Sequence, residues 1–139
     1  MNYAQTLGER VKVAAPAIAN ASPKLKNEAL AAIAAALLQQ TDRILQANAE
    51  DLAAAVQNNM TESLQDRLRL TPARMQGMAD AIEKLIAMDD PVGVVESGSV
   101  RPNGLQILKT RVPLGIIGII FESRPNVTVD AATLCLKAG

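Results

Sequence analysis

The chain has 139 residues, of which 49% are hydrophobic and 20% are charged, so it is one folded domain, or part of a larger one, and not a disordered chain. Its 14 basic and 14 acidic side chains cancel, and only Tyr3 and Phe121 are aromatic, which argues against nucleic-acid binding. One cysteine and no histidine exclude a disulfide framework, a histidine-ligated or cysteine-rich metal site and Ser-His-Asp catalysis within this chain. No secretory signal and no apolar run of about 18 residues is visible, so we expect a reduced, cytoplasmic setting without a membrane partner.

The first ninety residues carry the signals of amphipathic helices. Alanine, the strongest helix former, is frequent as far as Ala87. Asn2 is a candidate N-cap for a first helix. Ser22-Pro23 and Thr71-Pro72 each place a capping side chain before a proline at the first helical position. These signals predict three of the helix starts.

Two further helical segments lie between those starts. The apolar pattern from Leu30 to Val56 predicts one or two helices, with a break near Gln40-Thr41 or at Asn48, since Thr41 and Asn48 could each cap a new start. Thr61 begins one short helix through Leu68. The helix after Thr71 has an apolar face and ends before Asp89; the residues of that face are Met75, Met78, Ile82, Leu85 and Ile86.

Between Met88 and Asp130 there is no alanine, and valine and isoleucine become frequent, which favours strands. Gly93–Val100 and Leu105–Val112 flank an Asn-Gly turn signal and predict a β-hairpin. Ile116–Ile120 is a continuous apolar run, typical of a central parallel strand buried on both faces. A loop at 122–126 then leads into a helix over Val127–Lys137, with Ala131, Leu134 and Cys135 on its inner side.

The predicted fold class is therefore α/β, with N-terminal helices and a hairpin leading into the first strand and helix of a Rossmann-like parallel sheet. A parallel strand followed by a helix needs a second parallel strand, and the sequence stops at Gly139. We therefore expect the 139 residues to begin a longer protein. The alternative is a complete chain in which Ile116–Ile120 pairs only with the hairpin.

The loop after Ile120 is the most suggestive place for chemistry, because ligands of α/β sheets bind beyond the carboxyl ends of the strands. Arg124 can form a bidentate contact with a phosphate or carboxylate. The amide of Asn126 can donate to a developing oxyanion. From spacing alone, however, Ser123 and Asn126 are better explained as helix caps and Arg124 as a surface charge.

The other candidates are better explained by structure. Asp89 and Asp90 mark the end of a helix before Pro91, and no neighbour in the sequence would perturb their pKa values. Cys135 lies in an apolar helical pattern, as a buried structural thiol would. Gly115 and Gly118 lie before and within the predicted strand, so they do not form a dinucleotide fingerprint. Nothing in the helical part indicates catalysis, and no metal site is expected.

The segment Arg111–Gly139, and above all Glu-Ser-Arg-Pro-Asn-Val-Thr-Val-Asp-Ala-Ala at Glu122–Ala132, closely resembles the gamma-glutamyl phosphate reductases of the aldehyde dehydrogenase superfamily. The motifs Ala47–Leu52, Asp66–Pro72 and Arg101–Leu105 resemble the same family in the same order. The resemblance covers essentially the whole chain and about the first third of a family member.

The resemblance implies an NADPH-dependent reductase that converts L-glutamyl 5-phosphate to glutamate 5-semialdehyde and phosphate in proline biosynthesis. The resemblance implies that a cysteine thiolate displaces phosphate to give a thioester, that hydride from the nicotinamide reduces the thioester carbon, and that the aldehyde then leaves. Asn126 matches the asparagine that helps to hold the oxyanion. The family's stretch that runs along the cofactor near the nicotinamide end is matched by Glu122, Ser123, Arg124 and Pro125. The catalytic cysteine lies downstream in the family, and Cys135 matches a helix position instead.

The resemblance also implies a domain division. Residues 1–90 match the helical part of the cofactor-binding domain, residues 91–112 an oligomerisation arm, and residues 113–139 the first strand, loop and helix of the NADP-binding sheet. The catalytic domain is absent, so we expect the 139 residues alone to be inactive.

Two alternative functions remain, one non-catalytic and one enzymatic. A truncated, non-catalytic module could bind subunits through its hairpin. A different acyl-phosphate or aldehyde dehydrogenase is disfavoured by the Ser-Arg-Pro-Asn loop, where ordinary aldehyde dehydrogenases carry an aromatic residue.

Overall fold

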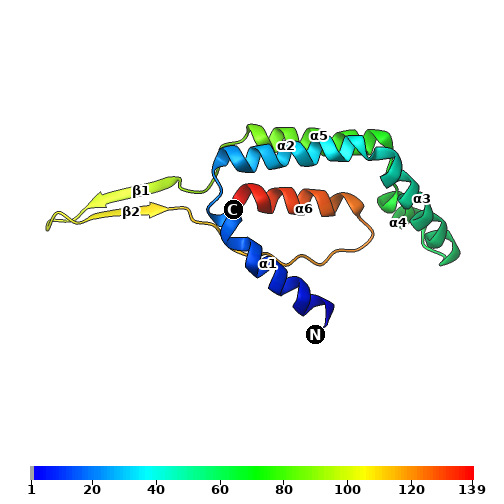
Figure 1. Cartoon of the computed structure of the whole chain (residues 1–139), viewed down its shortest axis with the longest axis horizontal. Helices are drawn as coiled ribbons and strands as arrows, with labels where there is room; N and C mark the ends of the chain where they lie inside the picture. Colours follow the sequence, from blue (N-terminus) through cyan, green and yellow to red (C-terminus); the bar gives the residue numbers. More distant parts are fainter. Residues whose placement is uncertain (1) are drawn as a thin grey trace.

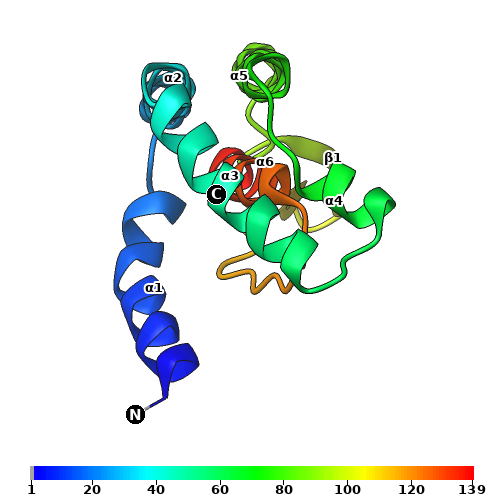
Figure 2. The same cartoon turned by 90° about the vertical axis from the view of Figure 1, so that its right-hand side faces the viewer.

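The computed structural model describes residues 2–139 and is mostly helical, with one two-stranded antiparallel sheet (Figure 1). Helices α2 and α5 run side by side, and α6 packs against both of them (Figure 2). The elements in chain order are α1 (Tyr3–Ala19), α2 (Pro23–Gln39), α3 (Thr41–Gln57), α4 (Glu62–Leu68), α5 (Pro72–Ala87), β1 (Val95–Val100), β2 (Gln106–Thr110) and α6 (Pro125–Ala138).

Local capping sets three of the helix starts. Asn2 Oδ1 accepts from the Gln5 N–H at 2.9 Å, and Gln5 Oε1 accepts from the Asn2 N–H at 3.0 Å, which makes a capping box for α1. The hydroxyls of Ser22 and Thr71 accept from the N–H groups of Leu25 and Arg74, the third residues of α2 and α5, and a proline follows each cap. The three predicted starts are confirmed.

The long helical segment breaks at Gln40, between α2 and α3. Thr41 does not cap the new helix, because its hydroxyl donates to the Leu37 carbonyl at 3.1 Å. A break at Asn48 is wrong, since Asn48 lies in the middle of α3 and is buried.

The core lies where α2, α5 and α6 meet. Leu30 of α2 and Ile82 of α5 are fully buried, and Val129 and Leu136 of α6 pack against their cluster. The predicted apolar face of α5 is confirmed at Met75, Met78 and Ile82, which are buried. By contrast α1 has no buried residue and extends away from this body (Figure 2).

The inner side of α6 differs from the prediction. Leu134 is 57% exposed, whereas Thr133 and Lys137 are buried. The helix begins at Pro125, before the predicted start, and is rotated so that Val129, Thr133 and Lys137 face α2 and α5. Lys137 can occupy this side because its ammonium group finds oxygen partners there.

The hairpin of β1 and β2 projects from the helices, and every residue of both strands is exposed (Figure 1). Pairing runs antiparallel from Val95 opposite Thr110 to Val100 opposite Gln106, with an irregularity between Val95 and Ser97. The predicted hairpin is confirmed. Of the two turn residues only Gly104 has a positive φ, at 84°.

The segment Ile116–Ile120 is not a strand in the structure, and its residues are exposed. A strand requires a hydrogen-bonding neighbour, and within residues 2–139 no segment pairs with it. The Rossmann-like parallel sheet is therefore not formed in this part of the chain, and the one sheet observed is the antiparallel pair. Among the described residues no helix combines the length and apolar content needed to cross a membrane.

A buried ionic cluster joins α2, α6 and the end of α5. Lys26 Nζ lies 2.6 Å from Asp90 Oδ2 and donates to the Lys137 carbonyl at 3.3 Å. Lys137 Nζ donates to Asn27 Oδ1 at 2.8 Å and to the Ile86 carbonyl at 3.4 Å. Both lysines are at least 95% buried, so these oxygen partners replace the water that burial removes.

The expectation that nothing perturbs Asp90 is wrong. Burial alone would raise the pKa of Asp90, but the hydrogen bond from Lys26, the Val92 N–H and the nearby charges of Lys26 and Lys137 lower the pKa of this carboxyl below its ordinary value. The lysines come from α2 and α6, far from Asp90 in sequence.

Asp90→Asn should lower the free energy of unfolding by about 3 kcal/mol at pH 7, because it leaves Lys26 buried without its counter-charge. A lowered carboxyl pKa stabilises the fold above the ordinary value of 3.8, and this contribution is lost as the pH falls through the folded-state pKa. Urea unfolding between pH 7 and pH 3 should therefore show the difference between the two proteins narrowing in acid.

The neighbouring exposed carboxylate supplies the control, and Asp89→Asn should change stability by less than about 0.5 kcal/mol. Equal effects of the two substitutions would contradict the buried cluster.

Candidate functional site

A hollow of about 460 Å³ opens between the α4–α5 region and the start of α6. We name it the arginine hollow, because four of its lining side chains are arginines. The lining residues are Asp66, Arg67, Arg69, Leu70, Arg74, Gly77, Met78, Arg124, Asn126 and Asp130. Its volume suits a small molecule.

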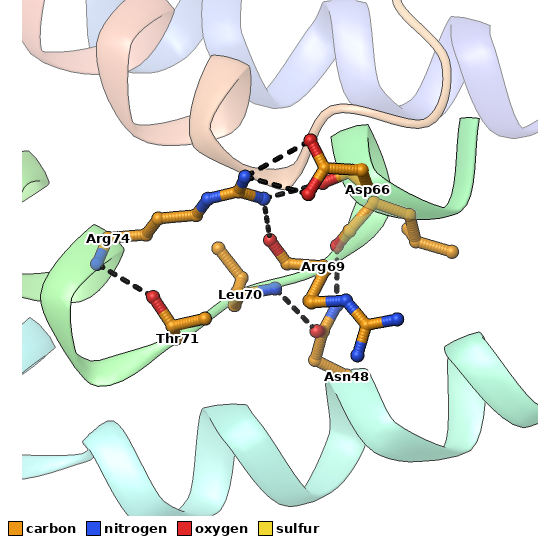
Figure 3. A network of polar contacts seen from close by, with 7 residues as sticks. Asn48, Asp66, Arg69, Leu70, Thr71 and Arg74 are labelled. Atoms are coloured by element: carbon orange, nitrogen blue, oxygen red, sulfur yellow. Dashed lines mark hydrogen bonds and ion pairs between the residues drawn. The ribbon is translucent and has the colours of Figure 1, made fainter. Parts of the chain in front are cut away.

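Asn48 holds the connector between α4 and α5 from one side (Figure 3). Its Nδ2 donates to the Leu68 carbonyl at 2.8 Å, and its Oδ1 accepts from the Leu70 N–H at 2.7 Å. The amide thus satisfies two backbone groups as a neighbouring strand would. Asn48 is 95% buried, so no water competes for these bonds.

Arg74, in the first turn of α5, holds the same connector from the other side (Figure 3). Its Nη2 contacts both carboxylate oxygens of Asp66, at 3.0 and 3.2 Å. Its Nη1 donates to the carbonyls of Asp66 and Arg69. The planar guanidinium thus links the last turn of α4 to the start of α5.

The other three arginines of the hollow are unpaired. Within residues 2–139, the guanidinium groups of Arg67, Arg69 and Arg124 make neither an ion pair nor a hydrogen bond. Asp66 already neutralises Arg74, and Asp130 is the remaining carboxylate of the lining. The hollow therefore carries a positive excess that faces solvent and can attract an anion.

The predicted site residues separate in the structure. Arg124 and Asn126 line the hollow, whereas Glu122, Ser123 and Pro125 do not. Glu122 is exposed, and Ser123 has a φ of 53°, in the left-handed region, at the bend that leads into α6.

The interpretation of Ser123 and Asn126 as helix caps is wrong. The N-cap position of α6 is Arg124, no side chain caps it, and Asn126 lies inside the first turn. Asn126 Nδ2 instead donates to Asp130 Oδ2 at 3.1 Å, one turn further along α6. Pro125 starts the helix two residues too early for Asn126 to act as its cap.

Sequence reasoning missed Asp66, Arg67, Arg69, Arg74 and Asp130. The charged residues of segment 66–69 lie in a motif shared with the resembled family. The sequence does not show that α6 packs beside this segment, and only that packing makes these residues the lining of a hollow. Asn48 lies in another of those motifs, and the structure joins the two through its hydrogen bonds.

Cys135 lies away from the hollow. It is half-buried and lines an apolar groove together with α1, Gly115–Ile117 and other residues of α6. Among the described residues, no group of three or more histidine, cysteine or acidic side chains could hold a metal ion.

Comparison with known proteins shows that the chain is similar to part of a longer protein, gamma-glutamyl phosphate reductase. No family model matches it. It is 52% identical over 133 residues to the gamma-glutamyl phosphate reductase of Thermobifida fusca, covering 96% of this chain and 32% of that protein. It is 48% identical over 139 residues to the enzyme of Yersinia pestis, covering 33% of its length.

Solved structures agree with the sequence matches. The crystal structure of gamma-glutamyl phosphate reductase from Thermotoga maritima superposes with a TM-score of 0.90 at 44% identity, over 94% of this chain and 31% of that one. The Saccharomyces cerevisiae enzyme gives 0.92 at 29% identity, over 99% of this chain and 35% of that one. The chain is thus a homologue of the N-terminal third of gamma-glutamyl phosphate reductases, and the resemblance indicated by its motifs is confirmed.

Asn48→Ala should lower the free energy of unfolding by about 2 kcal/mol, because it leaves the Leu68 carbonyl and the Leu70 N–H without partners. Urea unfolding followed by circular dichroism measures the loss. Gln46→Ala, at an exposed position of the same helix, should change stability by less than about 0.5 kcal/mol. A loss no greater than that of the control would exclude the proposed role of Asn48.

Proposed function

We propose that the protein carrying this sequence is a glutamate-5-semialdehyde dehydrogenase that converts L-glutamyl 5-phosphate and NADPH to glutamate 5-semialdehyde and phosphate, in proline biosynthesis. One observation carries the proposal from this chain's own residues: an amide with a free donor, Asn126, lines the same hollow as unpaired arginines. The substrate combines a reacting carbonyl with anionic groups, and this lining complements both. Relatives named gamma-glutamyl phosphate reductase match 96% or more of the chain.

Asn126 is the proposed oxyanion donor. When a nucleophile adds to the acyl carbon, the carbonyl oxygen gains negative charge, and a fixed N–H lowers the barrier to that step. The side-chain amide has two N–H groups, and Asp130 accepts one of them at 3.1 Å. The other remains available to the substrate, and the Asp130 contact fixes the plane of the amide.

The nucleophile is proposed to lie outside residues 1–139. Cys135 is half-buried in the apolar groove and does not line the arginine hollow, so it cannot attack a carbonyl held at Asn126. Residues 1–139 alone should consequently lack the activity.

Residues Glu122 to Pro125 are the proposed contacts of the cofactor. Within the described chain, Glu122 and Ser123 make no backbone hydrogen bond, so their N–H and carbonyl groups are free for a ligand. With the hydroxyl of Ser123 and the guanidinium of Arg124, this donor set fits a nicotinamide dinucleotide, whose amide, ribose and phosphate groups all accept hydrogen bonds. When bound, NADPH supplies the hydride.

The domain division of the family is also part of the proposal. Residues 1–90 form the helical part of the cofactor-binding domain, and residues 113–139 form its first strand, loop and helix. Ile116–Ile120 would become a strand on pairing with another segment, and helices packed on both faces of that sheet would cover its exposed isoleucines. A cytoplasmic location fits the single unpaired cysteine.

Residues 91–112 are the proposed oligomerisation arm. No residue of either strand is buried or belongs to the helical core, and an isolated two-stranded hairpin is marginally stable in water. Its exposed apolar side chains, among them Val100, Ile107 and Leu108, would be covered by another copy of the protein.

Replacing Ile107 and Leu108 together by serine in the full-length protein should shift it from an oligomer to a monomer in sedimentation velocity. The hydrogen bonds of the hairpin are backbone contacts and remain. Replacing the exposed Thr110 by serine is the control and should leave the assembly unchanged. An unchanged sedimentation coefficient in the double variant would contradict the arm's role.

Asn126→Ala in the full-length protein should lower kcat about 100-fold or more, with a smaller change in KM, because the donor acts mainly in the transition state. The assay is phosphate-dependent reduction of NADP by glutamate 5-semialdehyde. Thr128→Ala, exposed in the same helix, should keep wild-type kcat. Wild-type kcat in Asn126→Ala would exclude the oxyanion role, and an inactive wild-type protein would overturn the proposed function in favour of a non-catalytic module.

A further inference from the structure

We propose that Arg67 and Arg69 form the subsite that binds the α-carboxylate of the glutamyl substrate. This inference rests on the proposed function and assigns the amino-acid end of its substrate to the α4–α5 side of the arginine hollow.

The charges of the hollow call for an anion. Like charges gathered in one hollow repel each other, and an anion between them removes that repulsion. Asp66 already neutralises Arg74, whereas Arg67 and Arg69 have no partner in the described chain. A guanidinium binds a carboxylate through two parallel hydrogen bonds, which makes arginine well suited to this task.

The two arginines are held on a rigid support although their side chains are free. The Arg69 carbonyl accepts from Arg74 at 2.6 Å. Asn48 binds the backbone on either side, at Leu68 and Leu70. Contacts from α3 and α5 thus fix the backbone of Arg69. The loss of conformational entropy when its guanidinium binds a ligand is therefore smaller than for an arginine on a mobile loop.

The position of Asn126 decides which anionic group meets these arginines. The phosphate is bonded to the carbonyl that Asn126 would polarise, so it lies at the α6 side of the hollow, where Arg124 also lies. The α-carboxylate is four bonds away from that carbonyl, about 5 Å in an extended chain. Arg67 and Arg69 come from the opposite, α4–α5 side, where that end of the substrate would reach.

Asp66 supplies a negative charge that can bind the α-ammonium group of the substrate. Its carboxylate is 68% exposed and lines the same hollow, so it can accept a further hydrogen bond while it remains paired with Arg74. A carboxylate beside two free guanidinium groups matches the zwitterionic head of an amino acid better than it matches a lone phosphate.

The test uses the full-length enzyme in the oxidative direction, with the concentrations of glutamate 5-semialdehyde and phosphate varied independently. Arg69→Met and Arg67→Met should each raise the KM for glutamate 5-semialdehyde about tenfold or more. The KM for phosphate should stay within about twofold, since phosphate binds at the other end. The kcat/KM for pentanal, which lacks the α-carboxylate and the ammonium group, should not change.

Two further variants separate recognition from folding. Arg43→Met, on the exposed face of α3 and outside the hollow, should leave both KM values unchanged. Arg69→Lys should restore part of the affinity, because it keeps the charge and loses the planar pair of donors. The Arg74 contact to residue 69 uses the backbone carbonyl, so all these variants keep it.

A rise in the KM for phosphate with an unchanged KM for the aldehyde would overturn the inference, because the arginines would then bind the phosphate end. An equal loss with pentanal would also overturn it, since the damage would be structural. If the wild-type protein were inactive, the proposed function would fail and calorimetric titration with L-glutamate would decide the subsite separately. Binding of L-glutamate to the wild-type protein that Arg69→Met weakens about tenfold would support the subsite. Equal affinity of the two proteins for L-glutamate, or no binding to the wild-type protein, would overturn it.

Discussion

The amide of Asn48 holds the backbone between α4 and α5, and the arginine hollow depends on that constraint. Its donor and acceptor satisfy the Leu68 carbonyl and the Leu70 N–H, at 2.8 and 2.7 Å, inside the protein. Arg74 adds a second fixed contact through Asp66 and the Arg69 carbonyl. Together these contacts hold the short connector between α4 and α5, which becomes one rigid wall of the hollow. The unpaired guanidinium groups on this wall therefore start from fixed backbone positions.

The opposite wall is α6, and a different interaction holds it. Val129 and Leu136 pack on the cluster around Leu30 and Ile82, while the buried ionic cluster ties the far end of α6 to α2 and to Asp90. Non-directional packing brings α6 to the body, and the directed contacts of Lys137 fix its rotation. That rotation presents Asn126 to the hollow, so the chemistry at one end of α6 is coupled to a charge cluster at the other.

Local signals predicted most of the elements. Asn2, Ser22 and Thr71 act within three residues of themselves, so their caps could be inferred from spacing, and Asn103-Gly104 likewise indicated the hairpin. Long-range partners escaped prediction. Asn48 looked like a cap because its true partners are 20 and 22 residues away, and Asp90 looked unperturbed because its lysines come from other helices. Ile116–Ile120 has the composition of a strand, but a strand also needs a neighbour, which composition cannot supply.

The central claim is that the hollow receives a glutamyl group with its carbonyl at Asn126 and its α-carboxylate at the α4–α5 side. The most direct measurement is a crystal structure of the full-length protein with L-glutamate bound. The account predicts α-carboxylate oxygens within about 3 Å of the guanidinium groups of Arg67 or Arg69, and the side-chain carboxyl near the amide of Asn126. Glutamate bound in the reverse orientation, or outside the arginine hollow, would contradict it.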